Sequence, residues 1–464
     1  MLKTRTVLAT ALACVAALTT SALSVGAATA SALPAKFDPA ILAPGASPRA
    51  IVGFTHDIGP GVFKRLAVAG ITSAVRIDTI DAVGVLGPVS AYKKIATWTD
   101  VKFVDDDSKI VFDNYSAKKD THVDAVREGQ GLKSKYTGKG VTVAVIDTGI
   151  WSAHPDLTDR VIKHVNFEPS WVWDQIQDGE YTDQVSEATG NPIDTFGHGT
   201  HVAGIVAGTG AAAGTKDPDM SGVAPGANLV DFQIAQAHQS GADIGWEVNA
   251  LVAYEYLIEH RNDKDYGPHG IRVASNSWSV YEVNSDAEPI SLIVQKAADK
   301  DIVNVFAASN DGCSNPKKST VAPGPNSLED VITVAASCKS DGCGLGMIAS
   351  FSSCGPEVDV TAPGADIYST MAPSADGASG GHNPPGDPKN KAYYVALSGT
   401  SMATPHISGI VALMLEANPK LHSAQIEKIL EKTAVDYAEK GFDVHFGFGQ
   451  VDALKAVAVA EKLL

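Results

Sequence analysis

Five of the six side chains are apolar in Val141-Thr142-Val143-Ala144-Val145-Ile146, so a strand formed here is hydrophobic on both faces. The runs at residues 302–306 and 331–335 have the same character. Strands of this kind belong to parallel sheets that helices cover on both sides. Helical stretches lie between them at 246–260 and 287–300. The pattern predicts an α/β fold, an open and mostly parallel sheet with helices on both faces, which places its ligands at the carboxyl ends of the strands.

A smaller unit precedes this sheet, over about residues 49–110. Short apolar runs at 50–54, 62–67, 75–77 and 82–86 are followed by helically spaced apolar positions over 89–98 and a strand pattern at 101–104. The order strand, helix, strand, strand, helix, strand is that of a split βαβ unit. We expect a small α+β, ferredoxin-like domain.

The amino terminus has the pattern of a secretory signal peptide. Lys3 and Arg5 precede an uncharged, Ala- and Leu-rich stretch, and small residues follow at 26–32. A membrane anchor needs about 20 strongly apolar residues, whereas Thr and Ser dilute this stretch. A lipoprotein signal at Cys14 is disfavoured, because Ala stands three residues before it. We expect a signal over residues 1–30, secretion of the chain, and no membrane association after processing.

Charge excludes some partners. The chain has 36 Lys and Arg against 53 Asp and Glu, a net charge of −17, and no basic stripe. Such a surface repels phosphate backbones, so we expect no nucleic-acid partner. Its 44% of apolar and 19% of charged residues are globular values.

Cysteine usage agrees with export. Apart from Cys14, the cysteines are Cys313, Cys338, Cys343 and Cys354. An even, local set in an exported protein predicts two disulfides, with three pairings open. Zinc is disfavoured, because no pair has the two-residue spacing of a zinc knuckle and no His stands among them in the sequence.

The first two candidate catalytic residues are an acid and an imidazole. Asp147-Thr148-Gly149 ends the first apolar strand, where a carboxylate can hold an imidazole in one tautomer, although Asp and Gly also form simple turns. His198 lies between two glycines that allow close backbone approach, ahead of a small-residue run that suits a buried helix. For His201, one helical turn later, a packed structural role is the better interpretation.

The third candidate is Ser401, in Gly399-Thr400-Ser401-Met402-Ala403-Thr404-Pro405-His406. It falls at the start of a predicted helix, where Pro405 is tolerated because it lies close to the first turn. A Ser there exposes Oγ and turns its own N–H toward a developing oxyanion. A lone Ser in this position is more often an N-cap.

Taken together and in the order Asp, His, Ser, the motifs at 147–149, 197–204 and 399–406 resemble those of the subtilisin-like serine proteases. The resemblance runs from about residue 116 to the C-terminus and includes 221–227 and 349–356. It implies a secreted serine endopeptidase that acts on polypeptides through an acyl-enzyme. Ser401 is then the nucleophile, His198 the general base and later acid, and Asp147 the residue that orients His198.

The same resemblance assigns two further parts of the site. Asn310 matches the family's oxyanion-hole donor, although Asn310-Asp311-Gly312 alone indicates only a turn. Ser277, Trp278 and Ser279 match the substrate-binding edge strand, where the family more often has Gly at the third position. Edge pairing with an extended peptide predicts broad specificity.

The small unit resembles the family's propeptide, an intramolecular chaperone and inhibitor. The resemblance implies a propeptide over 31–115, a catalytic domain over 116–464 and self-cleavage near Tyr115-Ser116. We expect a monomer.

Metal and disulfide assignments also come from the resemblance. Asp156 matches a calcium ligand of many relatives, but the completing loop is missing between 208 and 220, and Asp359 matches a weaker cation site. Catalysis is expected to need no cofactor, with structural calcium as an option. Comparable bridges in some relatives favour the pair Cys313–Cys354, and Cys338–Cys343 would then close a tight loop.

Two alternatives to a broad endopeptidase stay open. One is a maturation protease of narrow specificity, and the other is a non-catalytic binding protein with the same fold. Two segments, 168–191 and 371–391, are extra to the family pattern, and they either border the cleft or are surface insertions.

Overall fold

The structure is a computed structural model that describes residues 36–38, 41, 49–107, 109–112, 120–167, 174–175, 194–213, 220–237, 243–280, 288–340, 343–372 and 393–464. The predicted signal peptide, the predicted cleavage site at 115–116 and most of the segments 168–191 and 371–391 lie outside the described residues.

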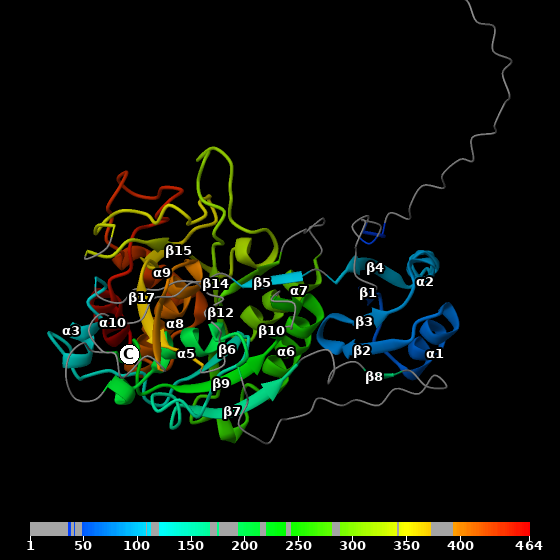
Figure 1. Cartoon of the computed structure of the whole chain (residues 1–464), viewed down its shortest axis with the longest axis horizontal. Helices are drawn as coiled ribbons and strands as arrows, with labels where there is room; N and C mark the ends of the chain where they lie inside the picture. Colours follow the sequence, from blue (N-terminus) through cyan, green and yellow to red (C-terminus); the bar gives the residue numbers. More distant parts are fainter. Residues whose placement is uncertain are drawn as a thin grey trace, which may run out of the picture. The chain divides into compact units, whose positions relative to one another are not determined.

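The predicted sheet is present as seven strands, all parallel to their neighbours. Their order is β16 (Val360–Pro363), β15 (Ile332–Ser337), β14 (Val303–Ala307), β12 (Ile271–Asn276), β6 (Thr142–Asp147), β9 (Asn228–Gln233) and β7 (Val161–Asn166). The three apolar runs of the sequence form β6, β14 and β15. The expected open α/β sheet is therefore confirmed (Figure 1).

Strand β6 shows why its sequence is apolar on both faces. Val143 and Val145 pack in the core cluster of α5 (His198–Ala207) and α8 (Thr400–Ala417). The alternate residues Ala144 and Ile146 pack in the cluster of α6 (Glu247–His260) and α7 (Pro289–Asp299). Because successive side chains of a strand point to opposite faces, both faces of β6 are buried under helices.

The remaining elements complete the large domain. They are the helices α3 (Val123–Glu128), α9 (Ser423–Thr433) and α10 (Ala453–Lys462), the 3-10 turns η3 (Ala211–Ala213), η4 (Lys264–Tyr266) and η5 (Gly324–Ser327), and the hairpin of β17 (Ile367–Thr370) with β18 (Tyr394–Leu397).

The small unit has the predicted order of elements. They are β1 (Arg49–Phe54), α1 (Pro60–Ala69), β2 (Ser73–Ile77), η2 (Asp78–Ile80), β3 (Ala82–Leu86), α2 (Val89–Ile95) and β4 (Val101–Asp106). The antiparallel sheet has the order β4-β1-β3-β2, and β8 (Asp174–Gln175) adds to its β2 edge. One face packs on α1 and α2 through Val52, Phe63 and Tyr92. The opposite face contributes Ile51 and Ile77 to the core cluster that contains α6.

A further antiparallel sheet joins parts of the chain that are distant in sequence. Its order is β10 (Ala235–Ala237), β11 (Asp243–Trp246), β5 (Lys109–Phe112) and β13 (Trp278–Val280). Strand β5, which follows the small unit, thus lies between two strands of the large domain, with Phe112 opposite Trp278.

Two disulfides, Cys313–Cys354 and Cys338–Cys343, have the expected pairing. Within the described ranges, no helix has both the length and the apolar character that a bilayer crossing requires.

Candidate active site

Asp147 and His198 meet at the carboxyl end of β6. Oδ1 of Asp147 lies 2.7 Å from Nδ1 of His198, and both side chains are buried. The backbone N–H of Thr148 donates to the same oxygen at 2.7 Å. A Cβ on Gly199 would come within 2.2 Å of the Gly149 carbonyl oxygen, so only glycine allows α5 to approach β6 this closely. The contact holds His198 with Nε2 directed away from Asp147, as a general base requires.

Asp194 is a site residue that sequence reasoning missed. It is fully buried just before α5, and it accepts five hydrogen bonds. The donors include the backbone N–H groups of Gly197 (2.7 Å) and Thr200 (2.9 Å) and the Thr200 hydroxyl (2.6 Å). Burial raises the pKa of Asp194 to about 6. An acidic residue a few positions before a helix start is a capping signal, which would have indicated this role.

Ser401 is the second residue of α8, and Pro405 explains how it is held. Pro405 has no N–H to donate to the Ser401 carbonyl four residues earlier. The Ser277 hydroxyl donates to that carbonyl instead, at 2.6 Å, and the Ser401 hydroxyl donates to the Ser277 carbonyl at 3.1 Å. The end of β12 and the start of α8 are therefore joined by two hydrogen bonds at the candidate nucleophile.

Asn310 follows β14 and faces the same helix start. Its Oδ1 accepts hydrogen bonds from the Thr400 backbone N–H at 2.9 Å and the Thr400 hydroxyl at 3.1 Å. Because a backbone N–H can only donate, these contacts fix the orientation of the amide group. The Nδ2 group is thereby directed away from Thr400 and is available as a donor.

The candidate substrate-binding strand supplies backbone rather than side chains. Trp278 is fully buried, and its indole N–H donates to the Ile146 carbonyl at 2.9 Å. Ser279 is also buried, with Oγ 3.5 Å from the Asn326 amide. The backbone of β13 pairs with β5, in the way an extended peptide would pair with it.

His201 has the structural role expected from the sequence. It is buried, Nε2 lies 3.2 Å from the Val395 carbonyl, and burial lowers its pKa to about 3. The ring is therefore neutral at working pH.

The candidate metal ligands differ in their surroundings. Both carboxylate oxygens of buried Asp156 are occupied by protein donors, the Ala212 N–H at 2.8 Å and the Tyr394 hydroxyl at 2.7 Å. Asp359 forms a group of three carboxylates with Glu427 and Glu431. Burial and these like charges raise the pKa of Asp359 to about 8. Calcium prefers six to eight oxygen ligands, so the donor type fits at Asp359, whereas each oxygen of Asp156 already accepts a hydrogen bond from the protein.

Residues 147, 198, 310 and 401 come from four distant parts of the chain and meet at the carboxyl ends of one parallel sheet. Asp147 and His198 lie at the end of β6, and Ser401 is bonded to Ser277 at the end of the neighbouring strand β12. An Asp–His pair and a helix-start serine at neighbouring strand ends of an open α/β sheet are the arrangement of a serine hydrolase.

Known proteins narrow this class. The sequence model of the subtilase family, Peptidase S8, matches residues 138–449. Serine protease AprX of Bacillus subtilis is 34% identical over 353 residues, which are 72% of this chain and 69% of that protein. Subtilisin E of the same organism is 34% identical over 321 residues, 69% of this chain and 66% of that protein. The chain thus spans about two thirds of the length of these relatives.

A solved structure agrees on the fold. The crystal structure of fervidolysin from Fervidobacterium pennivorans, a keratinolytic enzyme related to subtilisin, has a TM-score of 0.66 and 24% identity, over 88% of this chain and 60% of that chain. The chain therefore belongs to the subtilase family of serine endopeptidases.

Proposed function

We propose that the protein is a secreted endopeptidase that hydrolyses peptide bonds with Asp147, His198 and Ser401, and that it is made as a self-processing zymogen. The observation that carries the proposal is the 2.7 Å contact of Asp147 with His198, beside the clamp between Ser277 and Ser401. A histidine with a purely structural role would not require a serine hydroxyl at the start of a neighbouring helix.

The reaction follows from these positions. Ser401 Oγ attacks the scissile carbonyl carbon while its proton passes to His198 Nε2, and Asp147 stabilises the imidazolium through Nδ1–H. The tetrahedral intermediate collapses when His198 protonates the leaving amine. Water then attacks the acyl-enzyme with His198 as base, which frees the acid and restores Ser401. Only the chain's own side chains and water take part, so no cofactor is needed.

Asn310 and the N-terminus of α8 form the proposed oxyanion hole. The bonds from Thr400 leave Asn310 Nδ2 as a donor, and the Ser401 N–H, at the second position of α8, has no partner within the helix. Donors that are held in place before the reaction stabilise the charge that develops on the carbonyl oxygen. We expect Asn310→Ala to lower kcat by about 10²–10³.

The small domain is the proposed propeptide, acting as inhibitor and folding aid. Support comes from β5, which occupies the place beside β13 that a substrate strand would take. Phe112, the last residue of β5, lies opposite Trp278, and the residue before Trp278, Ser277, is bonded to Ser401. This register supports cleavage within a few residues after Phe112, in keeping with a site near 115–116. N-terminal sequencing of the secreted form tests this, and a start well beyond Asp124 would refute it.

A fluorophosphonate probe and an unfolded protein substrate test the catalytic proposal. The mature enzyme is expected to form one adduct, on Ser401, and to degrade unfolded casein, whereas Ser401→Ala does neither. Ser408→Ala is a matched control, because Ser408 lies on the same helix and is buried with its hydroxyl on Thr404 and Ser275. Absence of the adduct in the wild type would favour a non-catalytic binding protein.

Cleavage of a peptide library separates broad from narrow specificity. Backbone pairing at β13 does not depend on the substrate's side chains, so we expect peptides of many sequences to be cleaved. Cleavage confined to one motif would identify a maturation protease instead. Structural calcium stays a prediction, with Asp359 and its two neighbouring glutamates as the oxygen donors.

A further inference from the structure

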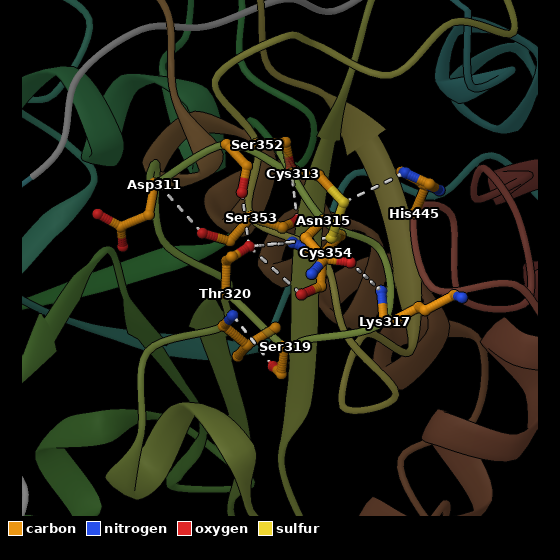
Figure 2. The surroundings of a disulfide bond; sticks show 12 residues. Asp311, Cys313, Asn315, Lys317, Ser319, Thr320, Ser352, Ser353, Cys354 and His445 are labelled. Atoms are coloured by element: carbon orange, nitrogen blue, oxygen red, sulfur yellow. Dashed lines mark hydrogen bonds between the residues drawn. A yellow bond between two sulfur atoms is a disulfide. The ribbon is translucent and has the colours of Figure 1, made fainter. Parts of the chain in front are cut away.

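A histidine, His445, lies beside the disulfide Cys313–Cys354, and no motif in the sequence indicates this contact. His445 lies 91 positions after Cys354, yet its Nε2 is 3.2 Å from Cys313 Sγ. The two sulfurs and the imidazole nitrogen lie within 4.8 Å of one another. Figure 2 shows His445 directed at the disulfide. Cysteine and histidine are the ligands that zinc prefers in proteins.

Backbone contacts hold the three segments together independently of the S–S bond. The Gly312 N–H donates to the Phe351 carbonyl at 2.8 Å, so the loop before Cys313 is tied to the segment before Cys354. The Thr320 N–H donates to the Cys354 carbonyl at 2.7 Å, and the Cys354 N–H donates to the Thr320 hydroxyl at 3.0 Å (Figure 2). These hydrogen bonds do not depend on the S–S bond, so we expect them to keep the two thiols near each other when the disulfide is opened.

The histidine is held in the same way. The Gly355 N–H donates to the carbonyl of Val444, at 2.9 Å, which ties the residue before His445 to the residue after Cys354. Asp443 accepts the His445 backbone N–H at 2.8 Å, and its Oδ1 lies 3.9 Å from Nδ1 of His445. A carboxylate behind the second ring nitrogen is the usual support for a metal-binding histidine.

We propose that Cys313, Cys354 and His445 form a redox-gated metal site, which binds one zinc or a similar soft divalent ion once the disulfide is reduced. In tetrahedral coordination, Zn–S of about 2.3 Å and Zn–N of about 2.0 Å separate the donor atoms by roughly 3.5–3.8 Å. The contact of 3.2 Å between Cys313 and His445 is already close to this spacing. A water completes the fourth position, because three protein ligands are at hand.

A dithiol is the reductant that opens the Cys313–Cys354 disulfide. The dithiol is oxidised to its disulfide, the Cys313–Cys354 bond takes up the two electrons and breaks, and the two protons end on the cysteine sulfurs. Metal binding then releases both protons to solvent, since the thiolates are the ligands. The loop after Asn310 is thus cross-linked either by the disulfide or by the metal.

Cobalt(II) titration tests the site without relying on activity. The chain carries Ser401→Ala to prevent self-digestion, and Cys14→Ser, Cys338→Ser and Cys343→Ser to leave one cysteine pair. It is reduced with a dithiol, freed of reductant without air, and titrated with Co²⁺. We expect thiolate-to-cobalt charge-transfer absorption that saturates at one ion per chain, is displaced by zinc, and is missing in the oxidised protein.

Two variants ask whether His445 is a ligand. His445→Ala is expected to weaken Co²⁺ binding at least about tenfold, because even loss of an outer-shell partner costs 10–100-fold. His422→Ala is the control, since His422 is exposed and pairs with Asp301 elsewhere on the surface, and it should change nothing. Absence of the charge-transfer band, or equal affinity in both variants, overturns the proposal. If reduction unfolds the chain, zinc must restore its near-ultraviolet circular dichroism, and failure to do so also overturns it.

Discussion

Buried carboxylates are treated in opposite ways at two places in this molecule. At the carboxyl end of the sheet, Asp194 accepts five hydrogen bonds, and Asp147 accepts from Thr148 and pairs with His198. Where the small domain meets the large one, Asp105 and Glu288 are buried close to other acids.

The second region carries a clear electrostatic cost. Burial, followed by the neighbouring Asp38, raises the pKa of Asp105 to about 8. Burial, followed by Asp105 and Asp38, raises the pKa of Glu288 to about 8. Burial and Glu288 also raise the pKa of Glu247, and Arg49 offsets part of the charge by lying 3.5 Å from Asp107. At the carboxyl end of the sheet, donors thus surround the buried carboxylates, whereas at the contact with the small domain acids are buried near one another, which disfavours their ionised forms.

The largest effect that tests this comparison is expected at the proposed catalytic pair, Asp147 and His198. Asp147→Asn is expected to lower kcat by about 10⁴, because an amide holds the wrong tautomer of His198. The measurement is kcat of the mature enzyme on a chromogenic peptide. Asp231→Asn is the control, since Asp231 pairs with His164 at 2.5 Å in an equally buried setting on the neighbouring strand β9. Equal losses of kcat in both variants would mean that Asp147 has only a structural role.

The next effect concerns the stability of the catalytic end. Asp194→Asn replaces one of two acceptor oxygens by a donor, which leaves some N–H and O–H donors at the start of α5 unpaired. We expect the free energy of unfolding to fall by about 2–4 kcal/mol, since hydrogen bonds to buried charges are each worth about 1.5–3 kcal/mol. Urea unfolding of Ser401→Ala chains measures it. Asp159→Asn, at an exposed position, should stay within about 0.5 kcal/mol of the parent, and a similar small change for Asp194→Asn would contradict the capping role.

The same two regions show which features of the molecule could be predicted from the sequence and which could not. The apolar runs predicted the parallel sheet because burial on both faces leaves a local signature, and Asp147 does lie at the carboxyl end of β6 and Ser401 at the start of α8. Asp194 was missed although it stands three residues before Gly197, where an acid can cap the predicted helix, because it lies outside the motif residues. Glu288 lies 183 positions after Asp105, and a contact over that distance has no local pattern. Long-range charge contacts were therefore not predictable, whereas motif residues were.

The contact with the small domain should weaken as the pH rises. A carboxyl group whose pKa is raised in the complex takes up a proton on association. Its favourable contribution to binding is complete below the pKa of the free group, and it is lost as the pH rises through the pKa in the complex, about 8 for Glu288. We expect the proposed propeptide, added as a separate polypeptide 31–115, to inhibit the mature enzyme at least about tenfold less strongly at pH 9 than at pH 5. Inhibition constants that do not change with pH would refute this account of the contact.

Glu288→Gln removes one of these titrating groups. It should strengthen inhibition at pH 9 by about tenfold and leave pH 5 unchanged, because the amide resembles the protonated acid. Glu439→Gln, at an exposed position, is the control and should alter neither value.

The smallest effect on inhibition is expected at Glu255. This residue tests whether burial alone, or the lack of hydrogen-bond donors, sets the pH dependence of inhibition. It is a buried acid on α6 at the same contact, but both of its oxygens accept the Thr79 N–H, at 2.8 and 3.0 Å. Burial still raises its pKa, to about 7, while the Thr79 bonds act in the opposite direction. Deprotonation of Glu255 in the complex therefore costs less free energy than deprotonation of Glu288. Glu255→Gln should strengthen inhibition at pH 9 by only about three- to fivefold, because the Thr79 hydrogen bond offsets about 1 kcal/mol of that cost. If Glu255→Gln matches Glu288→Gln, burial alone sets the pH dependence, and the donors that distinguish the two regions have no part in it.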